Sequence, residues 1–233
     1  MRRIVRGVVG LVVVLGIVSA GVAFYYFTYS PDRTIHPLRG IDVSHHQGFV
    51  DWRKVARSDV AFAILKATEG GDYVDDSFAR NLAGAAAAGL VVGAYHFFTF
   101  CRPGAEQAAN FLKVVPRDRP MLPPVVDIEF GGNCAARPAV ADLQRELTAF
   151  LTPVEAAFGR PAIVYVIDEA AAQYQAAIPN RRRWVRSLGR PPGNGDWVLW
   201  QYHNAGRVDG IESAVDLNML RGGADELKAL AGG

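Results

Sequence analysis

A surplus of either charge is missing from most of this sequence. The 25 basic residues nearly balance the 23 acidic ones, and three of the basic residues, Arg2, Arg3 and Arg6, precede an uncharged N-terminal run. Without those three, 22 basic residues remain against 23 acidic ones. A domain this close to neutral lacks the basic surface that a nucleic-acid backbone requires, so we expect no nucleic acid as a partner.

Metal-ligand and nucleophile motifs are missing as well. The five histidines form no H-x-H or H-x-x-x-H pair, the two cysteines lack metal-site spacing, and no G-x-S-x-G element is present. These absences argue against a zinc site and against a serine hydrolase triad. A metal held by acids together with His45, His46 or His96 would lack supporting spacing. We therefore expect neither a metal nor a cofactor.

Signs of disorder are also missing. The chain has no low-complexity tract and no internal repeat, and 50% of its 233 residues are hydrophobic whereas 21% are charged. This composition excludes a disordered or fibrous protein. The length fits one domain of moderate size.

A long uncharged run does occur near the N-terminus. Residues 7–29 hold no charged side chain, and a helix of about 20 apolar residues is enough to cross the hydrocarbon core of a membrane. The preceding arginines keep the N-terminus in the cytoplasm, and the aromatic residues at 24–27 and 29 suit the far interface. We therefore expect an anchor at 1–30, a linker at 31–38 and an exported domain at 39–233.

A cleaved signal peptide is the alternative interpretation of the same run. Gly21, Val22 and Ala23 form a small-residue cleavage site. The apolar run continues beyond that site, which favours a retained anchor. Both interpretations export the domain, as a single-pass membrane protein in the first case and as a secreted protein in the second.

Short apolar runs alternate with helical segments after the linker. Strands are expected at 39–44, 60–68, 90–98, 122–129, 161–167, 184–188, 196–203 and 214–218. Helices are expected at 51–57, 76–88, 104–115, 139–158, 168–177 and 225–230. Repeated strand–helix units predict an α/β fold with a parallel sheet and helices outside. Eight strands are enough for a closed barrel, and an open doubly wound sheet is the alternative.

Four acids lie at the ends of these expected strands, where parallel α/β folds gather their chemistry. They are Asp42, Asp127, Glu129 and Asp216. Because side chains alternate along a strand, Asp127 and Glu129 share a face about 7 Å apart, and repulsion leaves one of them protonated. Glycosidases use such a pair, a protonated acid beside an ionised partner. A solvated edge or a salt bridge is the alternative, and the preceding Pro-Pro-Val-Val run argues against an edge.

Aromatic and polar side chains accompany these acids. Sugar rings stack on aromatic faces and need polar partners for their hydroxyls, which suits a glycan groove. The expected substrate-binding residues are Tyr95, Phe97, Trp200, Tyr202, Lys66 and Glu69. Lys66 also stands where it can pair with one of the acids. Core packing is the alternative for these aromatic residues, and we assign Trp184 and Phe62 to the core.

The ordered motifs resemble glycoside hydrolase family 25, the lysozymes of the Chalaropsis type. The matching stretches are GIDVSHHQGFVDW (40–52), FAILKATEG (62–70), AGLVVGAYHFF (88–98), LPPVVDIE (122–129), WVLWQY (197–202) and VDLN (215–218). The resemblance implies an irregular eight-stranded barrel with about five helices. It also implies an N-acetylmuramidase that hydrolyses the β-1,4 bond between N-acetylmuramic acid and N-acetylglucosamine in the glycan strands of peptidoglycan, without a cofactor. We expect a monomer, although no motif in the sequence specifies the oligomeric state.

The resemblance also implies roles for the four acids. Glu129 matches the general acid, Asp127 the carboxylate beside it, and Asp42 and Asp216 two further acids at the floor of the groove. A chitinase-like D-x-x-D-x-D-x-E pattern fails, because Val125 and Leu122 stand where aspartates are needed. A peptidoglycan-binding protein without turnover is the other alternative. It would be expected to lack a catalytic acid.

Two cysteines remain in the exported part. Cys101 follows the expected strand that ends in YHFF, and Cys134 follows the strand that ends in DIE. Consecutive parallel strands are usually neighbours, so both loops leave the same end of the barrel. In an oxidising compartment we expect a disulfide across the mouth of the groove. Two unpaired thiols are the alternative.

Overall fold

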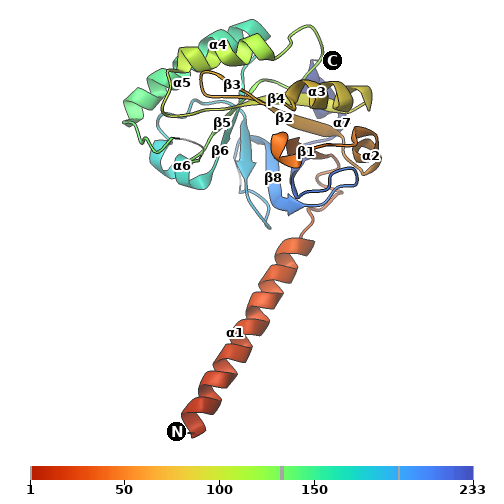
Figure 1. Cartoon of the computed structure of the whole chain (residues 1–233), viewed down its shortest axis with the longest axis vertical. Coiled ribbons are helices and arrows are strands. Elements are labelled where there is room, and N and C mark those ends of the chain that lie inside the picture. The colour runs from red at the N-terminus through yellow and green to blue at the C-terminus, as the bar shows by residue number, and fades with distance from the viewer. Residues whose placement is uncertain (1, 132–133, 194, 233) are drawn as a thin grey trace.

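Eight strands of one sheet close into a barrel in a computed structural model, which describes residues 2–131, 134–193 and 195–232 (Figure 1). The order around the barrel is β1-β9-β8-β7-β6-β5-β4-β2, and a parallel pairing of β1 with β2 closes the ring. The strands are β1 (Arg39–Val43), β2 (Phe62–Glu69), β4 (Val91–Phe97), β5 (Val125–Ile128), β6 (Ile163–Val166), β7 (Arg183–Arg186), β8 (Trp197–Gly206) and β9 (Val215–Leu220). A short strand, β3 (Tyr73–Val74), pairs with the end of β2. The expected closed barrel is therefore confirmed, and the open doubly wound sheet is wrong.

One strand of the barrel departs from the expected parallel arrangement. β9 runs antiparallel to both of its neighbours, β8 and β1. A parallel return needs a crossover connection of a dozen residues or more. Only residues 207–214 separate β8 from β9, so the chain turns back directly.

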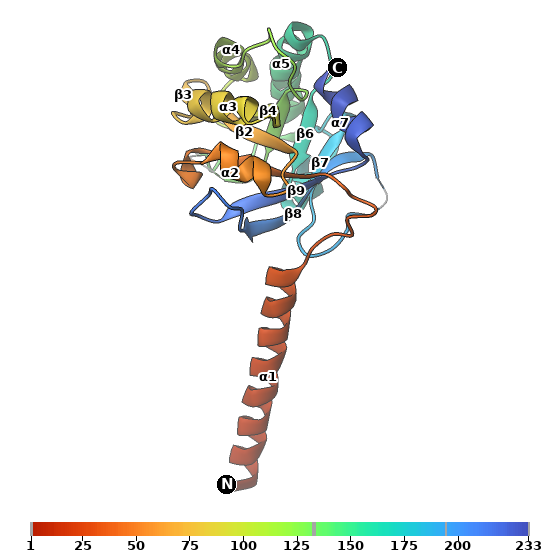
Figure 2. The same cartoon turned by 90° about the vertical axis from the view of Figure 1, so that its right-hand side faces the viewer.

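Helices cover the outside of the barrel (Figures 1 and 2). In the described residues they are α2 (Trp52–Arg57), α3 (Phe78–Ala87), α4 (Gly104–Val114), α5 (Val140–Phe158), α6 (Asp168–Tyr174) and α7 (Ala224–Ala231), with a 3-10 turn, η1 (His45–Gln47). This is one α-helix more than the resemblance implied. The last helix, α7, completes the interior core, because its Leu227 and Leu230 pack with the residues inside the barrel.

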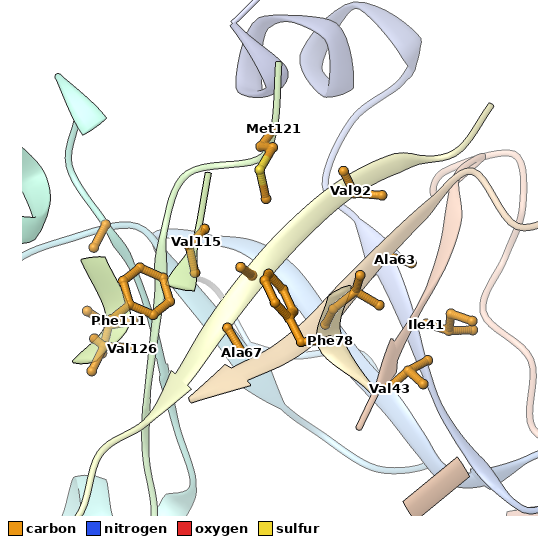
Figure 3. Packing of buried hydrophobic residues seen from close by; sticks show 14 of the residues in the cluster. Ile41, Val43, Ala63, Ala67, Phe78, Val92, Phe111, Val115, Met121 and Val126 are labelled. Carbon is orange, nitrogen blue, oxygen red and sulfur yellow. The ribbon is translucent and has the colours of Figure 1, made fainter. Parts of the chain in front are cut away.

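Alternation along the strands separates an outer core from the barrel interior. Val126 and Ile128 of β5 belong to the outer layer between sheet and helices, part of which Figure 3 shows around Phe111 and Val92. Val125 belongs to the interior cluster, and Asp127 continues the same face of the strand. The interior of the barrel is thus apolar at the amino ends of the strands and becomes polar toward their carboxyl ends.

Close packing inside the barrel explains one glycine. Gly40 of β1 lies against the ring of Phe62, and a Cβ atom at this position would come within 2.2 Å of that ring. Phe62 is completely buried, as expected from the sequence. Any side chain at position 40 would push this ring out of the barrel interior.

The N-terminal run forms one long helix that projects away from the barrel (Figures 1 and 2). This helix is α1 (Arg2–Thr28), and its stretch Gly10–Thr28 has a mean hydropathy of 2.1 with none of it buried inside the protein. By length and composition it is a candidate membrane span, and a signal sequence has the same properties.

Candidate active site

A cavity of about 320 Å³ opens at the carboxyl ends of the parallel strands. Its lining includes all four acids that the sequence singled out, together with six other residues. The complete lining is Asp42, Tyr95, Asp127, Glu129, Tyr165, Trp184, Arg186, Gln201, Asn204 and Asp216. A pocket of this size, lined mainly by polar side chains, is suited to a sugar ring with several hydroxyl groups.

Strand register explains why acids from distant parts of the sequence meet here. Asp42 in β1 stands directly opposite Asp216 in the antiparallel strand β9. Directly opposed residues of antiparallel strands have neighbouring side chains on one face of the sheet. On the other side of the barrel, Asp127 and Glu129 point to the same interior face, which puts both pairs around one cavity.

A hydrogen-bond network at the floor of the cavity centres on Asp42. Its Oδ2 atom accepts hydrogen bonds from Asn218 Nδ2 at 2.7 Å and from Gln201 Nε2 at 3.3 Å. Trp184 Nε1 donates to Asn218 Oδ1 at 2.8 Å, and the Tyr165 hydroxyl donates to Gln201 Oε1 at 3.1 Å. Each amide is therefore oriented by an aromatic donor, which fixes the position of the Asp42 carboxyl group.

The Asp42–Asp216 pair has an uneven distribution of its protons. Burial and the neighbouring charge of Asp216 raise the pKa of Asp42 well above its ordinary value. Burial also raises the pKa of Asp216, but a hydrogen bond from Asp42 and the nearby guanidinium of Arg186 oppose that rise. Asp42 is thus the member that holds a proton, and Asp216 is the member that ionises first.

Burial and neighbouring charges also set the pKa values of the second pair of acids, Asp127 and Glu129. Burial and the charge of Glu129 raise the pKa of Asp127 well above its ordinary value, and Asp127 Oδ1 is buried without a hydrogen-bond partner. Burial raises the pKa of Glu129, while Arg186 and Lys66 lower it. Burial therefore biases both carboxyl groups toward the protonated form. The sequence had suggested an ionised partner beside the protonated acid, because a strand pattern does not reveal how far Asp127 is buried.

Four of the expected substrate-binding residues lie in or near the cavity. Tyr95 is part of the cavity wall, and Lys66, Glu69 and Phe97 lie together beside the acids. Lys66 Nζ forms an ion pair with Glu69 Oε2 at 2.6 Å and lies 4.9 Å from the ring centre of Phe97. Its charge still reaches the acids, as its effect on Asp127 and Glu129 shows. Lys66 therefore pairs with Glu69 rather than with one of the four acids.

Trp200 and Tyr202 do not lie in the cavity, so the expectation that they stack on a sugar is wrong. Their side chains are 0% and 2% exposed and belong to the outer core. Gln201, which stands between them, lines the cavity, and alternation turns both of its neighbours to the opposite face. The indole nitrogen of Trp200, its only polar side-chain atom, donates a hydrogen bond to the backbone oxygen of Ser187 at 2.8 Å, so Trp200 is fully satisfied in the outer core.

Trp184 is a core residue, as the sequence assigned it, because its side chain is 2% exposed and packs in the interior cluster of the barrel. It also borders the cavity, with its indole nitrogen bonded to Asn218, which the sequence did not predict. Arg186, two residues later in β7, faces the same cavity. Trp184 and Arg186 are two positions apart near the end of a strand, so their side chains share one face. This spacing could have predicted both as lining residues, and sequence reasoning missed it. Tyr165, Gln201 and Asn204 were also missed as lining residues.

The expected disulfide is present. Cys101 and Cys134 are joined, with their Cα atoms 5.7 Å apart. The bond connects the loop after β4 with the loop after β5, so it lies next to the segment that carries Glu129. Residues 132 and 133, which precede Cys134, lie outside the described residues.

A closed α/β barrel whose carboxyl end gathers four acids is the architecture of a barrel glycosidase. The model of the glycosyl hydrolases family 25 matches residues 41–211, and the chain belongs to this family. The chain is 34% identical over 223 residues to lysozyme M1 of Streptomyces globisporus, covering 86% of this chain and 75% of that protein.

Solved structures show the same barrel. A family 25 glycosyl hydrolase from Bacillus anthracis aligns with a TM-score of 0.80 and 34% identity, covering 87% of this chain and 97% of the other. The bacterial lysozyme from Streptomyces coelicolor aligns with a TM-score of 0.76 and 32% identity, covering 83% and 96%. The fold and the family are therefore established for nearly the whole region after the linker.

Proposed function

We propose that this chain is an N-acetylmuramidase that hydrolyses the β-1,4 bond between N-acetylmuramic acid and N-acetylglucosamine in bacterial peptidoglycan. The observation that carries the proposal is the meeting of Asp42, Asp127, Glu129 and Asp216 around one cavity at the carboxyl end of the barrel. Membership of family 25 and the similarity to lysozymes support the substrate class. No metal or cofactor takes part in the proposed reaction.

In this proposal Glu129 donates a proton to the glycosidic oxygen. Burial raises its pKa, which favours the protonated form that a general acid needs, and it is more accessible than Asp127. As the bond breaks, positive charge grows on the sugar ring, and the buried carboxyl groups beside it become its counterions. Asp216, the readily ionised member of its pair, faces that charge, and Asp127 and Asp42 release their protons most easily when the charge develops.

The aromatic side chains of the cavity hold the sugar. Tyr95, which lines the cavity and is partly exposed, is proposed as the stacking surface in place of Trp200 and Tyr202, and Trp184 supports it from the cavity wall. Tyr165 and Gln201 act as positioning residues through Asp42. Lys66, Glu69 and Phe97 are proposed to form one flank of the groove.

The test compares the wild type with Glu129→Gln on purified cell wall and analyses the released muropeptides. We expect turnover to fall by at least about 100-fold, the lower end for loss of general acid catalysis. Glu106→Gln is the matched control, because Glu106 is an exposed acid on α4 and its loss is expected to leave turnover unchanged. Near wild-type lysis by Glu129→Gln would remove Glu129 from its role, and wall binding without any hydrolysis by the wild type would favour the non-catalytic alternative.

We further propose that α1 is retained as a membrane anchor with the barrel outside the cytoplasm. The support is an apolar stretch of 19 residues none of which is buried inside the protein, arginines on its N-terminal side, and a disulfide that needs an oxidising compartment. A reporter that is active only outside the cytoplasm, fused after Ser30, is expected to be active. Recovery of a soluble protein shortened at Ala23 would favour the cleaved signal peptide.

A further inference from the structure

The end of α1 is bound to the barrel by specific contacts. The hydroxyl of Tyr25 donates to the backbone oxygen of Gly189 at 2.8 Å. The hydroxyl of Tyr26 donates to Asn204 Oδ1, and its ring lies 4.9 Å from the ring of His203. Two consecutive side chains of the last helical turns therefore hold α1 to the loop after β7 and to the end of β8.

The segment after the helix continues this contact. The ring of Tyr29 lies 6.3 Å from the ring of Trp200 and 6.4 Å from that of Tyr202. Arg33 then forms an ion pair with Asp59 at 2.8 Å. The burial of Trp200 and Tyr202, which takes them out of the sugar groove, is thus partly contact with the chain that leads out of the helix.

These contacts lie at the catalytic end of the barrel. Gly189 follows β7, and Asn204 lies near the end of β8, which runs parallel to β7. Asn204 also lines the cavity that holds the four acids. The helix end is therefore attached to a wall of the catalytic cavity itself, and Figure 2 shows α1 leaving the barrel beside β8.

The length of the apolar stretch sets the height of the attachment above a membrane. At about 1.5 Å per residue, the 19 residues of Gly10–Thr28 span about 28 Å, close to the thickness of a hydrocarbon core. Tyr25 and Tyr26 then lie at the headgroup level, where such side chains are favoured. Because Asn204 contacts Tyr26, the cavity wall lies at that level as well.

We propose that residues 25–33 form a rigid joint that holds the catalytic cavity against the membrane surface and limits the enzyme to glycan in the layer next to the bilayer. The proposal rests on the muramidase function and the retained anchor proposed above. A loose tether would let the barrel swing out into the wall. The ring contacts of Tyr26 and Tyr29 and the ion pair of Arg33 with Asp59 join this segment to the barrel at three positions.

The experiment uses the full chain in lipid vesicles. Glycan of the muramic acid type is attached to vesicle lipids through either a short or a long polyethylene glycol spacer, and soluble wall fragments are measured in parallel. The wild type is expected to cleave short-spacer glycan at least about five-fold faster, because a fixed cavity meets only substrate at its own height. Inserting nine Gly and Ser residues between Thr28 and Tyr29, together with Tyr25→Phe and Tyr26→Ala to remove the contacts that precede the insertion, adds a flexible reach of about 17 Å. This variant is expected to lose the preference, with a ratio near one, and to keep its rate on soluble fragments.

Point variants locate the effect. Tyr26→Ala removes the contacts with His203 and Asn204 and is expected to weaken the short-spacer preference. Phe24→Ala is the matched control, because Phe24 is an aromatic residue of the same helix with a side chain that is 72% exposed. It is expected to keep the wild-type ratio. Hydrogen exchange at the end of β8 is expected to rise in Tyr26→Ala and to stay unchanged in Phe24→Ala.

Three results would overturn the joint. They are an equal rate on both spacers in the wild type, an insertion variant that keeps the wild-type ratio, and a mature protein that begins after Ala23. Failure of the proposed function looks different, because then no variant hydrolyses even the soluble fragments.

Discussion

Removing the disulfide between Cys101 and Cys134 should lower the stability of the barrel by a calculable amount. The bond closes a loop with a sequence separation of 33 residues. In the chain-entropy model, a loop of this length restricts the unfolded state by about 3.7 kcal/mol at 25 °C. For a domain of about 200 residues, each kcal/mol corresponds to roughly 2–4 °C, so we expect Tm to fall by about 7–15 °C.

Calorimetry of the full chain in detergent measures this change. The variant is the double substitution Cys101→Ser and Cys134→Ser, which leaves no stray thiol. Reducing the wild type with a thiol reagent should reproduce the same fall in Tm, because both treatments open the same loop. Reduction of the double variant is the control and should change nothing. Agreement between the chemical and the genetic experiment separates the bond from the effect of two new hydroxyl groups.

A smaller change would refute the reasoning. If Tm fell by less than about 2 °C, the unfolded chain would already be restricted in this region and the chain-entropy model would not apply.

The bond also borders the segment that carries Glu129. Turnover of the double variant at 25 °C, well below its Tm, should therefore fall more than its affinity for the wall. A fall confined to KM would show that the bond acts on binding instead.

The remaining predictions concern single side chains. Burial lowers the pKa of His96 to about 4, so the unfolded chain binds more protons than the folded chain below pH 6.5. The free energy of unfolding should therefore fall by on the order of 3 kcal/mol as pH drops toward 4. Urea unfolding of His96→Gln should show a shallower dependence on pH. Arg186→Gln should raise the pKa of Glu129 and move the alkaline limb of the kcat/KM profile to higher pH, because Arg186 opposes the rise caused by burial; an unchanged limb would exclude that effect. Trp184→Phe should lower kcat while Trp200→Phe should chiefly lower Tm, since Trp184 lines the cavity and Trp200 lies in the outer core; equal effects on both quantities would contradict the assignment.

Local pattern was enough to predict most of the barrel. The strand that contains Asp127 was recognisable because a short apolar run directly after two prolines predicts a buried strand. The structure has β5 at Val125–Ile128. The four acids were recognisable because each stands near a strand end, and parallel strands carry such residues to one end of the sheet. Their meeting around one cavity followed from topology rather than from any contact visible in the sequence.

Errors arose where the face of a strand decides the outcome. Trp200 and Tyr202 of β8 were expected to bind the substrate, but Gln201 between them faces the cavity and both aromatic side chains face the outer core. The strand carries register shifts between Gln201 and His203 and between His203 and Gly206, which simple alternation does not anticipate. The antiparallel direction of β9 was missed for a similar reason, because loop length had to be weighed against the repeating strand–helix pattern. The contact of Tyr26 with His203 joins segments 177 positions apart, and no local pattern reports it.

The burial of Asp42 implies that the catalytic cavity lowers the stability of the barrel. Because its pKa in the folded state is raised by burial and by Asp216, the folded chain binds more protons than the unfolded chain above pH 3.8, and stability falls as pH rises. Asp42→Asn keeps an acceptor for Asn218 and Gln201 and removes the charge. We expect the variant to be more stable than the wild type at pH 7, on the order of 1 kcal/mol or more. The difference should shrink as pH falls toward 3.8 and vanish only below that value, where Asp42 is protonated in both states. Urea unfolding at pH 4, 6 and 8 measures it, with the exposed acid variant Asp118→Asn as control. A stability difference that does not change with pH would mean that Asp42 is ionised in the folded protein, and the roles of Asp42 and Asp216 would then have to be exchanged.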